Sequence, residues 1–175
     1  IKGIKLHPAY TATPIDDPKH IRILKAAASL ELPVTTHAGI DIGIPERNYC
    51  DTKMLLHVLE QVPDTKLILA HMGGWTGWDE VARDLAGTPF YYDTSFSFGP
   101  LYPRQDKKQE SLSALMSEEE FVNLCHILGT EKILFGTDSP WADQKEYAER
   151  FLTLPFTQEE KNEMLYDNAA KLLCL

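Results

Sequence analysis

The sequence predicts an α/β domain in which helices cover a parallel sheet, and three observations support this fold class. Five segments of strand length recur along the chain, at residues 3–6, 33–37, 66–71, 90–94 and 132–137. Segments with apolar residues at helical spacing lie between them, and this strict alternation is typical of a parallel sheet. The strand segments are also largely apolar, as expected for strands that are buried on both faces.

Helices are expected after each of the first three strands, at residues 18–30, 51–62 and 78–86. Asp16 or Asp17 precedes the first helix and Asp51 precedes the second. Aspartate is a preferred N-cap because its carboxylate accepts the free N–H groups of the first turn. Gly87 is expected to end the third helix, since glycine readily adopts the left-handed backbone that closes a helix.

A long loop follows the fourth strand, and most of the remaining chain is expected to be helical. Residues 97–113 include one glycine and two prolines, which interrupt regular structure, and loops of this length are often functional. Ser117 with Glu120, and Thr157 with Glu160, each form the capping-box pattern of a helix start. The expected helices cover residues 117–128, 144–151 and 157–173.

The composition is that of a globular domain with an acidic surface. The chain has 17 basic and 26 acidic residues, a net charge of −9, so no nucleic-acid partner is expected, because phosphate backbones select basic surfaces. No apolar run approaches the roughly 20 residues of a membrane-spanning helix, so no membrane partner is expected either. The three cysteines Cys50, Cys125 and Cys174 are far apart, which predicts no disulfide framework and favours the reducing cytoplasm.

Polar or ionisable side chains lie at the end of each expected strand. They are Lys5, His7, His37, His71, Asp93 and Asp138. The carboxyl ends of parallel strands meet on one face, where ligands bind in α/β proteins. His37, His71 and Asp138 together offer the imidazole and carboxylate ligands that zinc and similar divalent ions prefer. A metal ion there would lower the pKa of a bound water and polarise a substrate carbonyl.

Several short motifs occur in a fixed order from Ile4 to Leu173. They are Lys-Leu-His-Pro at 5–8, Thr-His-Ala-Gly at 36–39, Ala-His-Met-Gly-Gly at 70–74, Asp-Thr-Ser at 93–95, Phe-Gly-Thr-Asp-Ser-Pro-Trp at 135–141 and Asn-Ala-Ala-Lys-Leu-Leu at 168–173. Together they resemble the amidohydrolase superfamily. The nearest resemblance is to the amidohydrolase-related family that includes aminocarboxymuconate semialdehyde decarboxylase.

The resemblance implies a (β/α)₈ barrel of the TIM type, incomplete here, with this chain supplying strands four to eight and their helices. It also implies that His37 is the strand-five metal ligand and Asp138 the strand-eight aspartate. His71 would be the strand-six histidine, which binds metal in some branches and acts as acid or base in others. The family's strand-one His-x-His pair is absent from this sequence.

Length supports an incomplete barrel, because complete barrels run to about 250 residues and this chain has 175. The chain starts at Ile1, inside an expected strand and without an initiator methionine. We therefore expect residues 1–175 to form a single domain, the C-terminal part of a metal-dependent hydrolase barrel.

The resemblance implies a metal-dependent hydrolase that acts on a small carbonyl or amide-type substrate through a metal-activated water. His71 and Asp138 would be catalytic, and the cofactor would be a divalent ion, with zinc the first expectation. Non-oxidative decarboxylation of a small unsaturated or aromatic carboxylic acid would use the same side chains. An inactive partial barrel that associates through its open sheet edges as a homo-oligomer is a third alternative. A doubly wound nucleotide-binding domain is a fourth, supported by the glycine-rich loop at residues 73–77.

Further side chains are candidates for binding a small-molecule substrate. Lys5 and His7 lie two residues apart, so both face the same side of their strand. Lys5 is expected to contact an anionic group or to pair with a neighbouring carboxylate, and His7 to bind substrate or to cap the strand end. Trp141 is expected to form a wall of a pocket for a planar substrate. Asp93 is either a contact in the site or an acceptor for loop amides.

Overall fold

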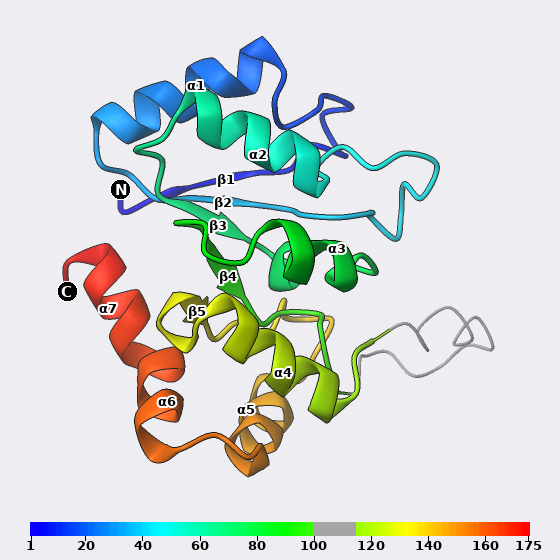
Figure 1. Ribbon diagram of the computed structural model, residues 1–175, viewed down its shortest axis with the longest axis vertical. Coiled ribbons are helices and arrows are strands. Elements are labelled where there is room, and N and C mark those ends of the chain that lie inside the picture. The colour runs from blue at the N-terminus through cyan, green and yellow to red at the C-terminus, as the bar shows by residue number, and fades with distance from the viewer. Residues whose placement is uncertain (100–114) are drawn as a thin grey trace.

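The computed structural model describes residues 1–99 and 115–175, so most of the predicted loop at 97–113 lies outside the described residues. A parallel sheet forms the centre of the molecule, with its strands in the order β1-β2-β3-β4-β5 (Figure 1). The strands are β1 (Ile4–Leu6), β2 (Val34–Thr36), β3 (Leu67–Leu69), β4 (Tyr91–Asp93) and β5 (Ile133–Leu134).

The order of the strands in the sheet is the same as their order in the chain. A doubly wound sheet reverses its strand order at the point where nucleotides bind, whereas a (β/α)₈ barrel adds each strand beside the preceding one. The nucleotide-binding alternative is therefore wrong, and the predicted fold class is confirmed for the described residues. Leu6 pairs with Thr36 and Thr36 with Leu69, so the carboxyl ends of the first three strands lie level.

Seven α-helices are described, and they follow the strands as the sequence predicts. They are α1 (Pro18–Ser29), α2 (Thr52–Gln61), α3 (Trp78–Asp84), α4 (Glu118–Leu128), α5 (Gln144–Thr153), α6 (Gln158–Asn162) and α7 (Asn168–Leu173). Asp17 accepts the Lys19 N–H and Asp51 accepts the Met54 N–H, each at 2.8 Å. Both predicted capping boxes, which begin α4 and α6, are present.

The strands are shorter than predicted because the backbone leaves the extended conformation where the polar residues begin. His71 has φ of 59° and opens a 3₁₀ segment, His71–Gly73, directly after β3. Asp138 has φ of 53° after β5, and the predicted start of β5 is a 3₁₀ turn, Thr130–Lys132. Left-handed backbone at residues other than glycine is uncommon and gathers at functional sites.

The predicted helix over 157–173 is interrupted by a π-helical segment, Glu163–Asp167, which joins α6 to α7. The carbonyl of Met164 in this segment accepts the Phe135 N–H at 2.9 Å. The buried Asn168 amide donates to the Thr130 and Ile133 carbonyls at 2.8 Å each. The C-terminal helices are thereby tied to the chain around β5.

The core joins the strands to the helices that cover them. Leu67 and Leu69 of β3 are fully buried, as are Leu24 of α1 and Leu55 of α2. Tyr147 of α5 donates its buried hydroxyl to the Thr94 carbonyl at 2.5 Å, next to the end of β4. These contacts hold the strand ends, and the residues that follow them, in fixed positions. Among the described residues, no helix has the length and apolar character needed to cross a membrane.

Candidate metal centre

A cavity of about 530 Å³ lies at the carboxyl ends of the strands. Its lining contains the residues that the sequence predicts to bind metal or substrate or to catalyse, namely Lys5, His7, His37, His71, Asp138 and Trp141. Trp75, Phe96 and Asp41 also line it, although no motif in the sequence predicts a role for Asp41. The level strand ends thus bring these side chains together, whereas their roles stay predictions.

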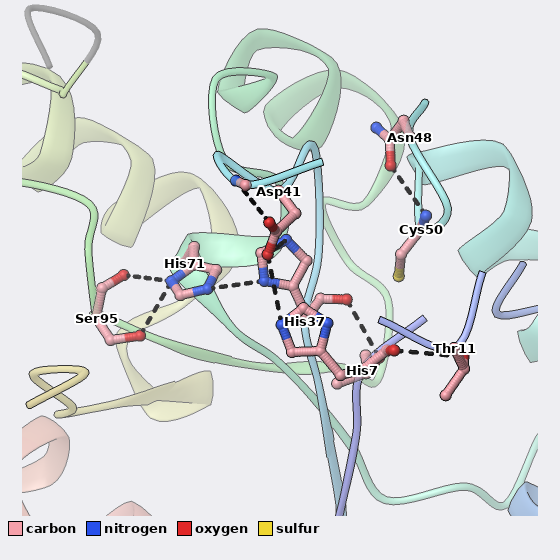
Figure 2. Close-up of polar contacts among 10 residues, drawn as sticks. His7, Thr11, His37, Asp41, Asn48, Cys50, His71 and Ser95 are labelled. Atoms are coloured by element: carbon pink, nitrogen blue, oxygen red, sulfur yellow. Dashed lines mark hydrogen bonds and ion pairs between the residues drawn. The ribbon is translucent and has the colours of Figure 1, made fainter. Parts of the chain in front are cut away.

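His71 and His37 lie in hydrogen-bond contact, and their protonation can be deduced from their partners (Figure 2). His71 Nδ1 is 3.0 Å from the Ser95 carbonyl oxygen, which only accepts, so Nδ1 carries the proton. His71 Nε2 therefore holds a lone pair and accepts from His37 Nδ1 at 3.1 Å. His37 Nδ1 is consequently the protonated nitrogen of that ring, and His37 Nε2 holds the other lone pair.

The His37 lone pair faces a carboxylate. His37 is buried, and its Nε2 has no hydrogen-bond partner. Asp41 Oδ2 lies 3.9 Å from this atom and 3.5 Å from His7 Nε2 (Figure 2). The other oxygen, Asp41 Oδ1, accepts the Gly43 N–H at 2.8 Å. This hydrogen bond fixes the carboxylate within the backbone turn at residues 41–43. A carboxylate oxygen and two imidazole rings therefore converge on one point of the cavity.

Both imidazole rings near Asp41 favour the neutral form. Burial lowers the pKa of His37 to about 3, and repulsion from Lys5, and from His71 or His7 whenever either is protonated, acts in the same direction. Burial also lowers the pKa of His7, against the opposing effect of Asp41. The contact between Asp41 and His37 is thus not an ion pair at neutral pH. Neutral imidazole is the form that binds a metal ion.

Asp93 holds the loops of the site together rather than lining the cavity. Its Oδ1 accepts the backbone N–H groups of His71 at 3.2 Å and Ser95 at 3.0 Å, together with the Ser95 hydroxyl. The alternative in which Asp93 is an acceptor for loop amides is therefore confirmed. Because His71 donates to the Ser95 carbonyl, Asp93 also fixes the group that sets the His71 tautomer.

Aromatic side chains form one wall of the cavity. Trp75 is buried and packs edge-to-face on Phe96, and its Nε1–H has no partner. Trp141, which the sequence predicts as a pocket wall, lines the cavity but is 51% exposed. Trp78 instead donates its Nε1–H to the His71 carbonyl at 3.0 Å and packs on the core. Lys5 forms no ion pair with any carboxylate that the structure describes.

The residue that sequence reasoning missed is Asp41. It lies four residues after His37, beyond the strand end, in the segment between Gly39 and Gly43. The spacing alone carries no chemical meaning, because a loop does not place residues four apart on one face. The one available signal was the pair of glycines on both sides of Asp41, which indicates a tight turn. Such a turn can bring a carboxylate back toward the histidine at the strand end.

The whole chain, residues 1–175, matches the family model described as amidohydrolase. A search of curated proteins finds no match. Among solved structures, the chain is similar to an uncharacterized TIM-barrel protein from Bordetella bronchiseptica, with 23% identity and a TM-score of 0.76 over 99% of this chain and 57% of that one.

Two further solved structures share the fold. A dihydroxybenzoic acid decarboxylase from Polaromonas sp. JS666, with bound manganese, has 16% identity and a TM-score of 0.62 over 93% of this chain and 55% of that one. A protein from Pseudomonas putida, proposed to be a 2-pyrone-4,6-dicarboxylic acid hydrolase, has 16% identity and a TM-score of 0.69 over 99% of this chain and 63% of that one.

The chain spans less than two thirds of each of these proteins, which fits a partial barrel. The match of the family model to the whole chain agrees with the motif resemblance that the sequence shows. The chain belongs to the amidohydrolase family, and its strand–helix units form part of a (β/α)₈ barrel.

Proposed function

We propose that this chain carries the metal-binding part of a hydrolase that acts on a small carbonyl or amide-type substrate. One observation carries the proposal: the buried lone pair of His37 Nε2 faces the Asp41 carboxylate in a cavity at the strand ends. Two electron-donating atoms that face each other without a hydrogen between them suit a bound cation. His37 is therefore a fitting ligand for the divalent ion that the family relationship suggests.

A bound ion would polarise a carbonyl oxygen and lower the pKa of a water molecule. Zinc is the proposed ion, because imidazole and carboxylate ligands suit it. His71 Nε2 is the nitrogen proposed to take up and deliver a proton. To do so it would give up its hydrogen bond with His37 Nδ1. Asp138, on the same cavity, is proposed to accept a proton and pass it to the leaving group.

Non-oxidative decarboxylation is the second candidate, and the cavity contains an observation that favours it. Lys5 forms no ion pair with a carboxylate among the described residues. It lines the same cavity as Trp75 and Phe96. A cationic side chain and an aromatic wall in one cavity suit a planar carboxylic acid. In this reaction His71 and Asp138 would manage protonation of the carbon that loses carbon dioxide.

A substrate panel distinguishes the two candidates. The panel contains lactones, amides and aromatic carboxylic acids, including 2-pyrone-4,6-dicarboxylic acid and 2,6-dihydroxybenzoate. We expect turnover that a chelator abolishes and that added zinc or manganese restores. Formation of a new carboxylate product without release of carbon dioxide indicates hydrolysis, and release of carbon dioxide indicates decarboxylation.

The controls for this panel test the metal and the third alternative. His37→Gln protein with an unchanged circular dichroism spectrum should be inactive at any metal concentration used. Turnover that survives exhaustive chelation would contradict the proposal. A protein that binds metal but converts no member of the panel would favour the inactive partial barrel instead.

A further inference from the structure

We propose that the indole N–H of Trp75 donates a hydrogen bond to an oxygen substituent on a planar substrate, and that Trp75 thereby determines which substrates the cavity accepts. The inference deepens the proposed function, on which it rests in taking the cavity at the strand ends as the substrate site. An oxygen substituent here means a hydroxyl group, a phenolate or a ring carbonyl, each of which accepts from an N–H group. Trp75 is a binding residue in this role and transfers no proton.

The cavity gathers buried polar atoms that lack a protein partner. In residues 1–99 and 115–175 these atoms are His7 Nδ1, His37 Nε2, Thr65 Oγ1 and Trp75 Nε1. All of them except Thr65 Oγ1 belong to residues that line the cavity. An indole N–H can only donate, so the partner that Trp75 lacks must be an acceptor. Buried indole N–H groups are usually hydrogen-bonded, because an unpaired one loses its hydration without compensation.

A second tryptophan in the same segment shows what is unusual about Trp75. Trp78, three residues later, donates its Nε1–H to the His71 carbonyl at 3.0 Å. Trp75 is 7% exposed and packs edge-to-face on Phe96, with the ring centroids 5.7 Å apart. Its Nε1 atom is itself covered, so a ligand has to draw the indole slightly toward the cavity in order to accept from it. The substrate then supplies the acceptor that the described part of the chain does not.

The backbone beside this aromatic wall is held in uncommon conformations. Phe96 has φ of 53° and Thr76 has φ of 66°. Left-handed backbone is rare for bulky and β-branched residues, and such strain gathers at functional sites. The backbone N–H of Trp75 donates to the Ala38 carbonyl at 3.1 Å, which ties this loop to the segment after β2. The two aromatic side chains are therefore fixed relative to the strand ends, as a selective binding wall requires.

The neighbours of Trp75 define the shape of the group that it recognises. Phe96 contacts both Trp75 and His71 edge-to-face, and its ring centroid lies 5.9 Å from that of His71. Two aromatic side chains on one wall favour a flat group, because flat rings pack well on one another in offset or edge-to-face arrangements. A planar group on this wall lies beside the imidazole that the proposed reaction uses for proton transfer. Trp75 therefore contacts a substituent of the substrate and not its reacting atoms.

Nuclear magnetic resonance tests the hydrogen bond directly, because the chain has three tryptophans and therefore three indole N–H signals. The whole chain, labelled with ¹⁵N-tryptophan, is titrated with benzoate and with 2-, 3- and 4-hydroxybenzoate, both with zinc and with a chelator. Trp75→Phe removes one signal and so identifies it. We expect at least one hydroxybenzoate to move the Trp75 indole proton downfield, as a new hydrogen bond does, and benzoate to move it less. The Trp78 proton already has an acceptor and should stay in place.

Calorimetry gives the matching test of affinity. The hydroxybenzoate that moves the signal should bind about 5–100-fold more tightly than benzoate, the range expected when a buried donor gains its acceptor. Trp75→benzothienylalanine, in which sulfur replaces the N–H in a ring of similar shape, should remove this advantage and leave the affinity for benzoate unchanged. Trp75→Phe should also remove the advantage, although its smaller ring lowers the affinity for every ligand. Tyr166→Phe is the control, because Tyr166 is exposed outside the cavity lining, and it should change no affinity.

Three results would overturn the proposal. They are an advantage of hydroxybenzoate over benzoate that survives both variants, a Trp75 indole signal that no ligand moves, and a failure of all these acids to bind. None of the measurements needs turnover. A chain that shows the expected shift and converts no substrate would refute the proposed function and support the role of Trp75.

Discussion

Replacement of His71 by asparagine is expected to lower turnover by about 10²–10⁴-fold at saturating metal, the usual contribution of a general acid or base. Metal affinity should fall by only about 10–100-fold, because both ring nitrogens of His71 already have protein partners and the residue supports His37 through a hydrogen bond. Asparagine suits the left-handed backbone of this position, where φ is 59°, so the fold should persist.

The measurement is kcat over a series of zinc concentrations, together with the affinity for zinc in the absence of substrate. His126→Asn is the control, because His126 contacts Glu160 outside the cavity lining. Full recovery of turnover at saturating zinc would show that His71 only positions His37. Complete loss of zinc binding would show that His71 is itself a ligand, as the resemblance allowed.

Replacement of Gly39 by alanine is expected to lower the free energy of unfolding by about 3 kcal/mol or more. Gly39 has φ of 88°, and a Cβ there would lie 2.3 Å from the Trp75 nitrogen and 2.7 Å from the Gly74 carbonyl carbon. These atoms are backbone and cannot move aside as a flexible side chain could. The loops after β2 and β3 meet at this point, where Trp75 donates its N–H to the Ala38 carbonyl at 3.1 Å. The change should therefore also distort the cavity.

Urea denaturation measures this loss, and Gly87→Ala provides a matched control. Gly87 has a similar φ of 77°, but nothing lies within 4 Å of a Cβ built there. Its replacement should cost only the backbone strain, about 1 kcal/mol. Equal losses in the two variants would contradict the account, because the close approach of the two loops would then contribute nothing.

Local signals in the sequence were sufficient to predict the order of the elements. The caps at Asp51 and Ser117 depend on residues within one turn, so the sequence shows them directly. The histidines at the strand ends were also predictable, because level parallel strands must bring them to one face. The π-helical segment was not, because it depends on the contact between Met164 and Phe135, which are far apart in the chain.

The contacts among the site residues could not be predicted from the sequence either, because they also join residues that are far apart in the chain. The free nitrogen of His37 follows from a chain of contacts through His71 to Ser95, and each link joins residues distant in sequence. Asp41 reaches the imidazole rings only because the turn at Gly43 directs its carboxylate back toward β1 and β2. A list of strand-end residues therefore identified the cavity but not the contacts among its side chains.

The most direct test of a metal site at these strand ends is to locate the ion itself. Anomalous diffraction from crystals of the chain grown with zinc would show its position and ligands. We predict one ion in this cavity, about 2.0–2.2 Å from His37 Nε2. Zinc sites that avoid His37 and this cavity would contradict the account.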